Sequence, residues 1–124
     1  MDDVTQAWIK ELVSLAVRGT SEMGVFDEAV IEARPEWALP NRLLVGKVRP
    51  QMDPRAFCWF ICGEVPLDYL RGDVATSPRE ALRHFAMKWQ LDAERTEDAG
   101  SADALIEHAE AVYARADDER VWIS

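Results

Sequence analysis

The segment from Phe57 to Cys62 constrains the fold more than any other, because all six of its side chains are apolar. In an extended strand successive side chains point to opposite faces, so Phe57, Trp59 and Ile61 share one face and the even-numbered residues share the other. A strand that is apolar on both faces needs cover on both sides. We therefore expect a central strand, buried inside a sheet.

The helix expected after this strand carries the clearest local signals. Ser77 is a typical N-cap residue, Pro78 suits the first helical position, and Glu80 lies where a capping box needs a carboxylate. The helix should end near Thr96. Its apolar stripe has helical spacing and consists of Leu82, Phe85, Ala86, Trp89 and Ala93.

Four further elements surround this strand and helix. They are a helix from Val4 to Arg18 capped by Asp2 or Asp3 and ended by Gly19, an edge strand from Glu28 to Arg34, a strand from Leu43 to Arg49, and a last helix capped by Ser101. Pro35 and Pro40 bracket a rigid connection that cannot continue a sheet. The stretch from Gly63 to Tyr69 is expected to be a turn.

The order of these elements predicts an α+β fold. We expect an N-terminal helix, a three-stranded antiparallel meander and two C-terminal helices packed on the sheet, all in one domain over residues 1–124. The first helix should bury the stripe Val4, Trp8, Leu12, Leu15 and Ala16. The last helix should bury Leu105, Ala109, Val112, Tyr113 and Ala116.

The charge of the chain excludes two classes of partner. A net charge of -9 disfavours non-specific nucleic-acid binding and adsorption to an anionic membrane, both of which need clustered basic residues. From Asp92 to Glu119 there are ten acidic residues against two arginines. We expect this acidic span to be a solvated surface, and the alternative is recognition of a basic partner. With neither a signal peptide nor an apolar run of about 18 residues, the chain is expected to be cytoplasmic.

Cys58 and Cys62 are not expected to bond to each other. Four residues along a strand separate their Cα atoms by roughly 13 Å, whereas a disulfide needs less than about 7 Å. We expect buried, unreactive thiols, and the alternative is an intermolecular or reactive cysteine.

The two histidines, His84 and His108, fall on different predicted helices without a second ligand at a fixed spacing. We expect structural or surface roles for both. The chain has no glycine-rich phosphate loop, no G-x-S-x-G and no H-E-x-x-H. We therefore expect no cofactor, no metal and no catalytic residue, and we lean towards a protein that is not an enzyme.

A group of polar residues follows the central strand. Glu64, Asp68 and Asp73 cluster there beside Tyr69 and Arg71, and loops on a rigid scaffold often carry function. We expect these side chains mainly to stabilise the turn, with ligand contact as the alternative. A ligand cleft between the central strand and the second helix would also use Trp59, Arg79 and His84.

Two of the five tryptophans are hard to place in a core. Trp37 lies between two prolines, and Trp122 lies in an apolar tail that follows an acidic turn. We expect Trp122 to dock back onto the body or onto a partner chain. Exposed tryptophan is enriched at binding surfaces, so both residues are candidates for the interface of a homodimer or of another protein partner.

The chain resembles a small bacterial family known as domain of unknown function 4826. The resemblance rests on an aromatic strand, a turn and a capped helix, at Trp59, Ile61, Cys62, Gly63, Pro66, Asp68, Tyr69, Pro78, Arg79, Glu80, Ala81, Arg83 and Trp89. The acidic end from Ala116 to Trp122 is also similar. The resemblance implies no activity.

The sequence thus favours a non-enzymatic cytoplasmic domain that acts through protein contacts as a homodimer. Two alternatives stay open. One is a small-molecule binder or enzyme with a cleft beside the central strand and second helix. The other is an acidic inhibitor or chaperone-like protein that binds a basic partner.

Overall fold

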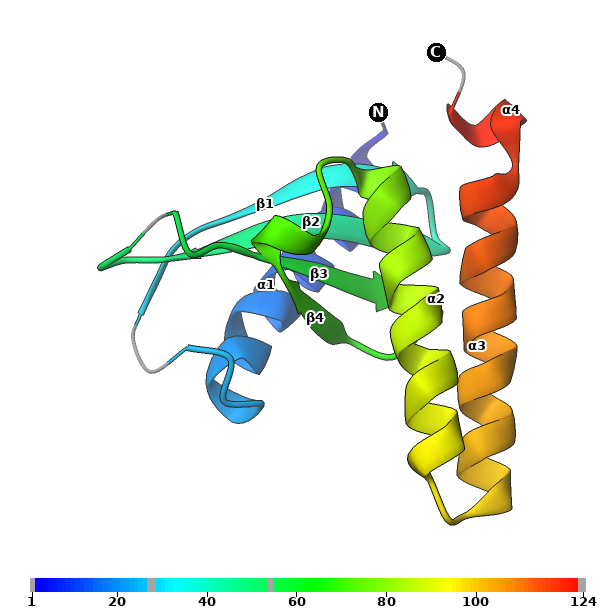
Figure 1. Ribbon diagram of the computed structural model, residues 1–124. Coiled ribbons are helices and arrows are strands. Elements are labelled where there is room, and N and C mark those ends of the chain that lie inside the picture. The colour runs from blue at the N-terminus through cyan, green and yellow to red at the C-terminus, as the bar shows by residue number, and fades with distance from the viewer. Residues whose placement is uncertain (1, 27–28, 54, 123–124) are drawn as a thin grey trace. The chain divides into compact units, whose positions relative to one another are not determined.

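The computed structural model describes residues 2–26, 29–53 and 55–122 (Figure 1). Its elements are α1 (Asp3–Glu22), β1 (Val30–Leu39), β2 (Leu43–Pro50), β3 (Cys58–Gly63), β4 (Asp68–Arg71), the short 3-10 helix η1 (Gly72–Val74), α2 (Pro78–Arg95), α3 (Ala99–Asp117) and α4 (Glu119–Trp122). The α+β class is confirmed. The chain divides into two compact units, one up to Val74 and one from Ala75 onward.

The first unit holds one antiparallel sheet with the strand order β1-β2-β3-β4. The meander is confirmed, but the sheet has four strands where the sequence predicted three. The extra strand is β4, which pairs with β3 through Asp68 opposite Ile61 and Arg71 opposite Cys58. Its first two residues lie in the stretch that was predicted to be a turn. Four residues with charged ends, shortly after Pro66, leave too little alternation to be recognised as a strand.

Strand β1 is longer than predicted, because it continues through Pro35 to Leu39. The prediction that Pro35 ends the strand is therefore wrong. β1 is an edge strand, and an edge is where a sheet tolerates a residue without an N–H. The pairing with β2 shifts between Pro35 and Trp37 and again between Val30 and Glu32. These irregularities let the strand absorb the proline.

The interior position of β3 is confirmed, since it pairs with β2 on one side and β4 on the other. Its residues from Trp59 to Cys62 are all buried. Phe60 and Cys62 belong to a core cluster with Ala16, against which Trp8 and Leu12 of α1 also pack. On the opposite face the Trp59 indole N–H donates to the Gly72 carbonyl at 3.3 Å.

Helix α1 begins as expected, because the Asp2 side chain accepts a hydrogen bond from the Thr5 N–H. The predicted stop at Gly19 is wrong, since the helix continues to Glu22. Gly19 is buried, and a Cβ there would lie 2.6 Å from Cδ2 of Leu67 and against the Tyr69 hydroxyl. Its role is close packing, not termination.

The predicted apolar stripe of α1 is wrong at two positions, because Val4 and Leu15 are exposed. The side that packs on the core cluster carries Trp8, Ile9, Leu12, Val13 and Ala16. It also buries the polar residues Thr5 and Thr20. The buried face of α1 also contains small and polar residues. A search for regularly spaced apolar residues overlooks them, so it placed the buried face wrongly.

In the second unit, α2 follows the prediction closely. The Ser77 side chain accepts from the Glu80 N–H at 3.2 Å, Pro78 opens the helix and Thr96 follows its end. The Glu80 carboxylate reaches one residue further back than a standard capping box, to the N–H and hydroxyl of Thr76. All five residues of the predicted stripe are buried.

Helix α3 differs from the prediction at its start and on one face. It begins at Ala99, and its cap is Asp98, whose carboxylate accepts from the Ser101 N–H at 2.8 Å. Ala109, Val112 and Ala116 are buried as expected. Tyr113 is 51% exposed, so its assignment to the core is wrong.

Helices α2 and α3 pack side by side as an antiparallel hairpin (Figure 1). Trp89 lies level with His108, with the two ring centres 6.3 Å apart in an edge-on arrangement. Neither these helices nor any other in the described ranges combines the length and apolar character needed to cross a membrane.

Candidate functional site

The polar residues predicted around β4 make local contacts. Glu64 is 3.8 Å from Arg42 in an exposed ion pair, and Arg71 pairs with Asp73 at 3.2 Å, also exposed. The Asp68 carboxylate accepts from the N–H of the next residue at 2.8 Å. These contacts hold the turn and the strand together.

Tyr69 is the buried member of this group, and its hydroxyl donates to the Ala16 carbonyl of α1. Burial, with a smaller contribution from the nearby Cys62, raises the pKa of the Tyr69 phenol. The phenol therefore keeps its proton at neutral pH and acts as a donor. Gly19, which leaves space beside this hydroxyl, makes the contact sterically feasible. Tyr69 thus ties β4 to α1.

Trp59 is buried on the sheet face opposite α1, and Lys47 lies over its ring. Lys47 Nζ is 4.8 Å from the centres of both the Trp59 and Phe57 rings, and Arg49 lies 5.1 Å from Phe57. Lys47 also approaches Glu36 of β1 at 3.4 Å. Lys47 and Arg49 therefore pack on the rings of Phe57 and Trp59, and Glu36 balances the charge of Lys47.

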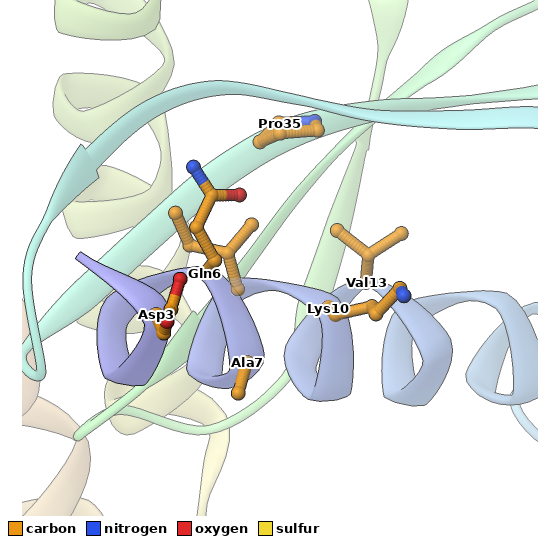
Figure 2. A pocket seen from close by; sticks show the side chains of 7 residues that line it. Asp3, Gln6, Ala7, Lys10, Val13 and Pro35 are labelled. Carbon is orange, nitrogen blue, oxygen red and sulfur yellow. The ribbon is translucent and has the colours of Figure 1, made fainter. Parts of the chain in front are cut away.

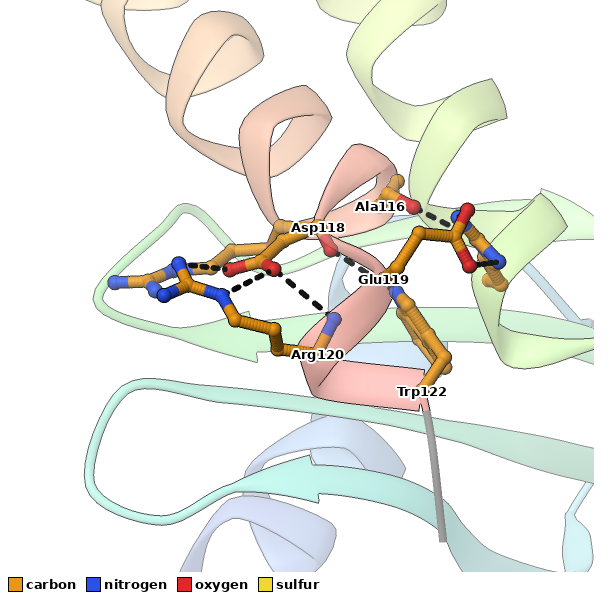
Figure 3. A network of polar contacts seen from close by, with 7 residues as sticks. Ala116, Asp118, Glu119, Arg120 and Trp122 are labelled. Atoms are coloured by element: carbon orange, nitrogen blue, oxygen red, sulfur yellow. Dashed lines mark hydrogen bonds and ion pairs between the residues drawn. The ribbon is translucent and has the colours of Figure 1, made fainter.

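Arg79 closes the open end of the helical hairpin. Its Nε donates to the Ala116 carbonyl and its Nη2 to Glu119 Oε1, each at 2.7 Å, and its guanidinium lies 5.9 Å from the Trp122 ring (Figure 3). The hydrogen bond from Arg79 lowers the pKa of the Glu119 carboxyl. We call Arg79, Ala116, Glu119 and Trp122 the C-terminal clamp.

Trp122, the last residue of α4, docks back on α3 of the same chain, since its indole N–H donates to the Arg115 carbonyl at 3.0 Å (Figure 3). Trp37 lies opposite Val45 in the sheet. Both tryptophans are half-buried. His84, the remaining residue of the predicted cleft, is half-buried on α2. Glu64, Asp68, Tyr69 and Trp59 belong to one unit, and Arg79 and His84 to the other.

Both cysteines carry free thiols. Burial raises the pKa of the Cys62 thiol to about 12 and also raises that of Cys58. A thiol with a raised pKa stays protonated at neutral pH and is a poor nucleophile. Among the residues that the structure describes, His, Cys, Asp and Glu do not gather in groups of three that could hold a metal ion.

A surface hollow that sequence reasoning missed lies between α1 and the edge strand β1. It has a volume of about 490 Å³ and is lined by Asp3, Gln6, Ala7, Ile9, Lys10, Val13 and Pro35 (Figure 2). Most of the lining residues recur every three or four positions along α1. That spacing was visible in the sequence, but the strand that forms the other wall was predicted to end before Pro35.

The hairpin exposes large apolar side chains. Met87 and Leu91 of α2 are 55% and 45% exposed, and Ile106 and Tyr113 of α3 are 40% and 51% exposed. A second hollow, of about 330 Å³, lies between the helices and is lined by Gln90, Ala93, Glu94 and Ile106. We call the exposed side that carries Met87, Gln90, Glu94, Ile106 and Tyr113 the hairpin face. The assignment of Tyr113 to the core hid this surface from the sequence prediction.

Comparison with known proteins identifies a family. A family model described as a domain of unknown function (DUF4826) matches residues 2–122. No curated protein and no solved structure matches the chain.

Proposed function

Since the chain belongs to the DUF4826 family, whose description carries no activity, we propose that it is a protein-interaction domain without chemistry of its own. One observation carries this proposal, namely the exposed apolar side chains of the α2–α3 hairpin. Met87 and Tyr113 each leave about half of their surface in water. Apolar and aromatic side chains grouped on one surface mark sites of protein contact.

The site residues of the first unit support the same view. The Tyr69 hydroxyl is hydrogen-bonded to a backbone carbonyl, Arg71 forms an ion pair with Asp73, and the Cys62 thiol has a raised pKa. A catalytic acid, base or nucleophile needs a pKa near the working pH and a reacting atom within reach. These groups instead have partners within the fold.

The proposal includes several finer statements. The protein works as a homodimer in a bacterial cytoplasm, and its two units form a single domain. Trp37 and Trp122 stay candidate interface residues beside the hairpin face. A partner with a basic surface is the rival within this class, because α3 carries four acidic residues against one arginine.

The hollow between α1 and β1 favours a second candidate function, the binding of a small molecule. Its volume of about 490 Å³ lies in the range of ligand pockets, and Asp3 and Lys10 offer opposite charges beside Ile9 and Val13. A thermal-shift screen of metabolites tests it. A hit that Val13→Trp abolishes would support binding there, and a flat screen would remove this alternative. The same screen tests the alternative cleft that would use Asp68, Arg79 and His84. A hit that Asp68→Ala abolishes would support that cleft.

Site-specific photo-cross-linking tests the interaction function. A photoreactive phenylalanine analogue at position 87 or 113 should give a discrete adduct in cells, which mass spectrometry identifies. The matched control is position 4, because Val4 is apolar and 74% exposed but lies on α1. Adducts of equal yield from all three positions, or from none, would contradict the proposal.

A further inference from the structure

The outward sides of α2 and α3 carry two stripes with the same spacing. The α2 stripe is Arg83, Met87, Gln90 and Glu94, and the α3 stripe is Ile106, Glu110, Tyr113 and Asp117. Both advance by four, three and four residues, which keeps each stripe on one narrow side of its helix, as in a coiled coil. All eight residues are exposed.

The two stripes border one groove. Gln90 and Glu94 from α2 and Ile106 from α3 line the same hollow of about 330 Å³. Because the helices are antiparallel, with Trp89 level with His108, the stripes also run in opposite directions. The two stripes therefore form parallel ridges, and beside Gln90, Glu94 and Ile106 a depression lies between them into which side chains of a facing helix can pack.

Charge decides which helix can face which. Helix α2 has four basic residues against three acidic ones, a net charge of +1, whereas α3 has one arginine against four acidic residues, a net charge of -3. An α3 helix laid on another α3 would bring like charges together. An α2 helix laid on an α3 helix brings opposite charges together.

We propose that the partner of the hairpin face is a second copy of this chain, with α2 of each copy lying antiparallel on α3 of the other. This inference rests on the proposed function and names its partner. The stripes then match position by position, as Arg83 with Asp117, Met87 with Tyr113, Gln90 with Glu110, and Glu94 with Ile106. The two-fold axis produces every match twice.

The matched pairs are chemically compatible. Arg83 and Asp117 form an ion pair, Met87 packs its thioether against the Tyr113 ring, and the Gln90 amide donates to Glu110. The aliphatic part of Glu94 covers Ile106. An α2–α2 pairing would match Arg83 with Glu94, but it would leave the acidic α3 stripes facing each other.

The size of the surface predicts a weak dimer. An 18-residue helix is about 27 Å long, and two helices side by side are about 20 Å wide, so roughly 1,100 Å² is buried over both copies. This area is near the lower limit for specific interfaces. Dimerisation should therefore depend on protein concentration and on salt.

Charge reversal tests the register by sedimentation velocity over a concentration series. Arg83→Asp places two aspartates opposite each other, and Asp117→Arg places two arginines opposite each other. Each variant alone should dimerise at least tenfold more weakly than the wild type. An equimolar mixture of the two should form a heterodimer within about threefold of wild-type affinity, since both of its ion pairs are then restored.

Matched controls come from the same helices. Lys88→Asp and Glu107→Arg change the charge by the same amounts but lie off the stripes, so they should leave dimerisation within about threefold of the wild type. Circular dichroism checks that all variants are folded.

Three outcomes would overturn the inference. The first is a wild type that stays monomeric over the whole concentration series. The second is a loss of dimerisation that the control variants cause to the same extent. The third is an Asp117→Arg variant that dimerises normally, which points to α2–α2 pairing. A monomeric wild type that still gives an adduct with another protein from positions 87 and 113 would overturn the second copy as partner and leave the interaction function standing. If the wild type stays monomeric and positions 87 and 113 give no specific adduct, both proposals are wrong.

Discussion

The two units differ in how they bury their apolar residues. The first consists of the sheet and α1, and the second contains the α2–α3 hairpin. In the first unit the interior strand β3 buries four consecutive side chains, from Trp59 to Cys62. The hairpin buries one side of each helix and leaves Met87 and Tyr113 about half exposed. The first unit thus has a strand that is buried on both faces, whereas each helix of the hairpin keeps one exposed side, on which Met87 or Tyr113 lies. Substitutions in the two units should therefore have different consequences.

The largest effect is expected from the interior strand. Trp59→Ala removes a fully buried ring and its hydrogen bond to the Gly72 carbonyl, so it should lower the free energy of unfolding by about 3–5 kcal/mol. Chemical denaturation measures this loss. A loss below about 1 kcal/mol would mean that the ring is not in the core.

The same substitution at two glycines should have opposite signs in the two units. Gly19→Ala drives a Cβ against Leu67 and the Tyr69 hydroxyl, and should cost about 1–3 kcal/mol. Gly100→Ala in α3 meets only the Asp98 carboxylate, at 3.5 Å, and should stabilise the helix by about 0.4–1 kcal/mol. Urea titrations of both variants check the pair, and equal effects would refute the contrast.

Removal of a helix cap should have an intermediate effect. Ser77→Ala deletes the acceptor for the Glu80 N–H, and should lower the free energy of unfolding by about 1 kcal/mol. Ser77→Asp, which keeps an acceptor, is the matched control and should stay close to the wild type. If alanine and aspartate behave alike, the cap does not contribute.

The smallest effect is expected at the C-terminal clamp, and it should depend on pH. The hydrogen bond from Arg79 lowers the pKa of Glu119 below its ordinary value of 4.5. A carboxyl with a lowered pKa stabilises the fold above its ordinary value, and the contribution is lost as the pH falls through the folded-state pKa. Glu119→Gln should thus reduce the urea midpoint at pH 7 and have no effect in strong acid. A difference that grows towards acid would contradict the pairing.

The sequence predicted best the elements whose signals are local. Ser77, Pro78 and the buried stripe of α2 depend on contacts within a few residues, and the structure reproduces them. The apolar strand from Phe57 to Cys62 was equally direct, because both of its faces had to be covered. Such patterns need no knowledge of distant partners.

The missed features depend on distant partners. The extension of β1 through Pro35 required knowing that the strand lies at an edge. The role of Gly19 required knowing that Tyr69, fifty residues later, reaches the Ala16 carbonyl. The exposure of Tyr113 required knowing which side of α3 meets α2. The hollow between α1 and β1 and the hairpin face were missed for these reasons.

The edge strand β1 has a consequence for behaviour at high concentration. A new strand added along it would find no N–H at Pro35, two interruptions of the regular pairing, and the charged side chains of Glu32, Arg34 and Glu36. Proline, bulges and charges at an edge are the features that oppose intermolecular strand addition. The longest strand of this sheet is thereby protected against growth into cross-β aggregates.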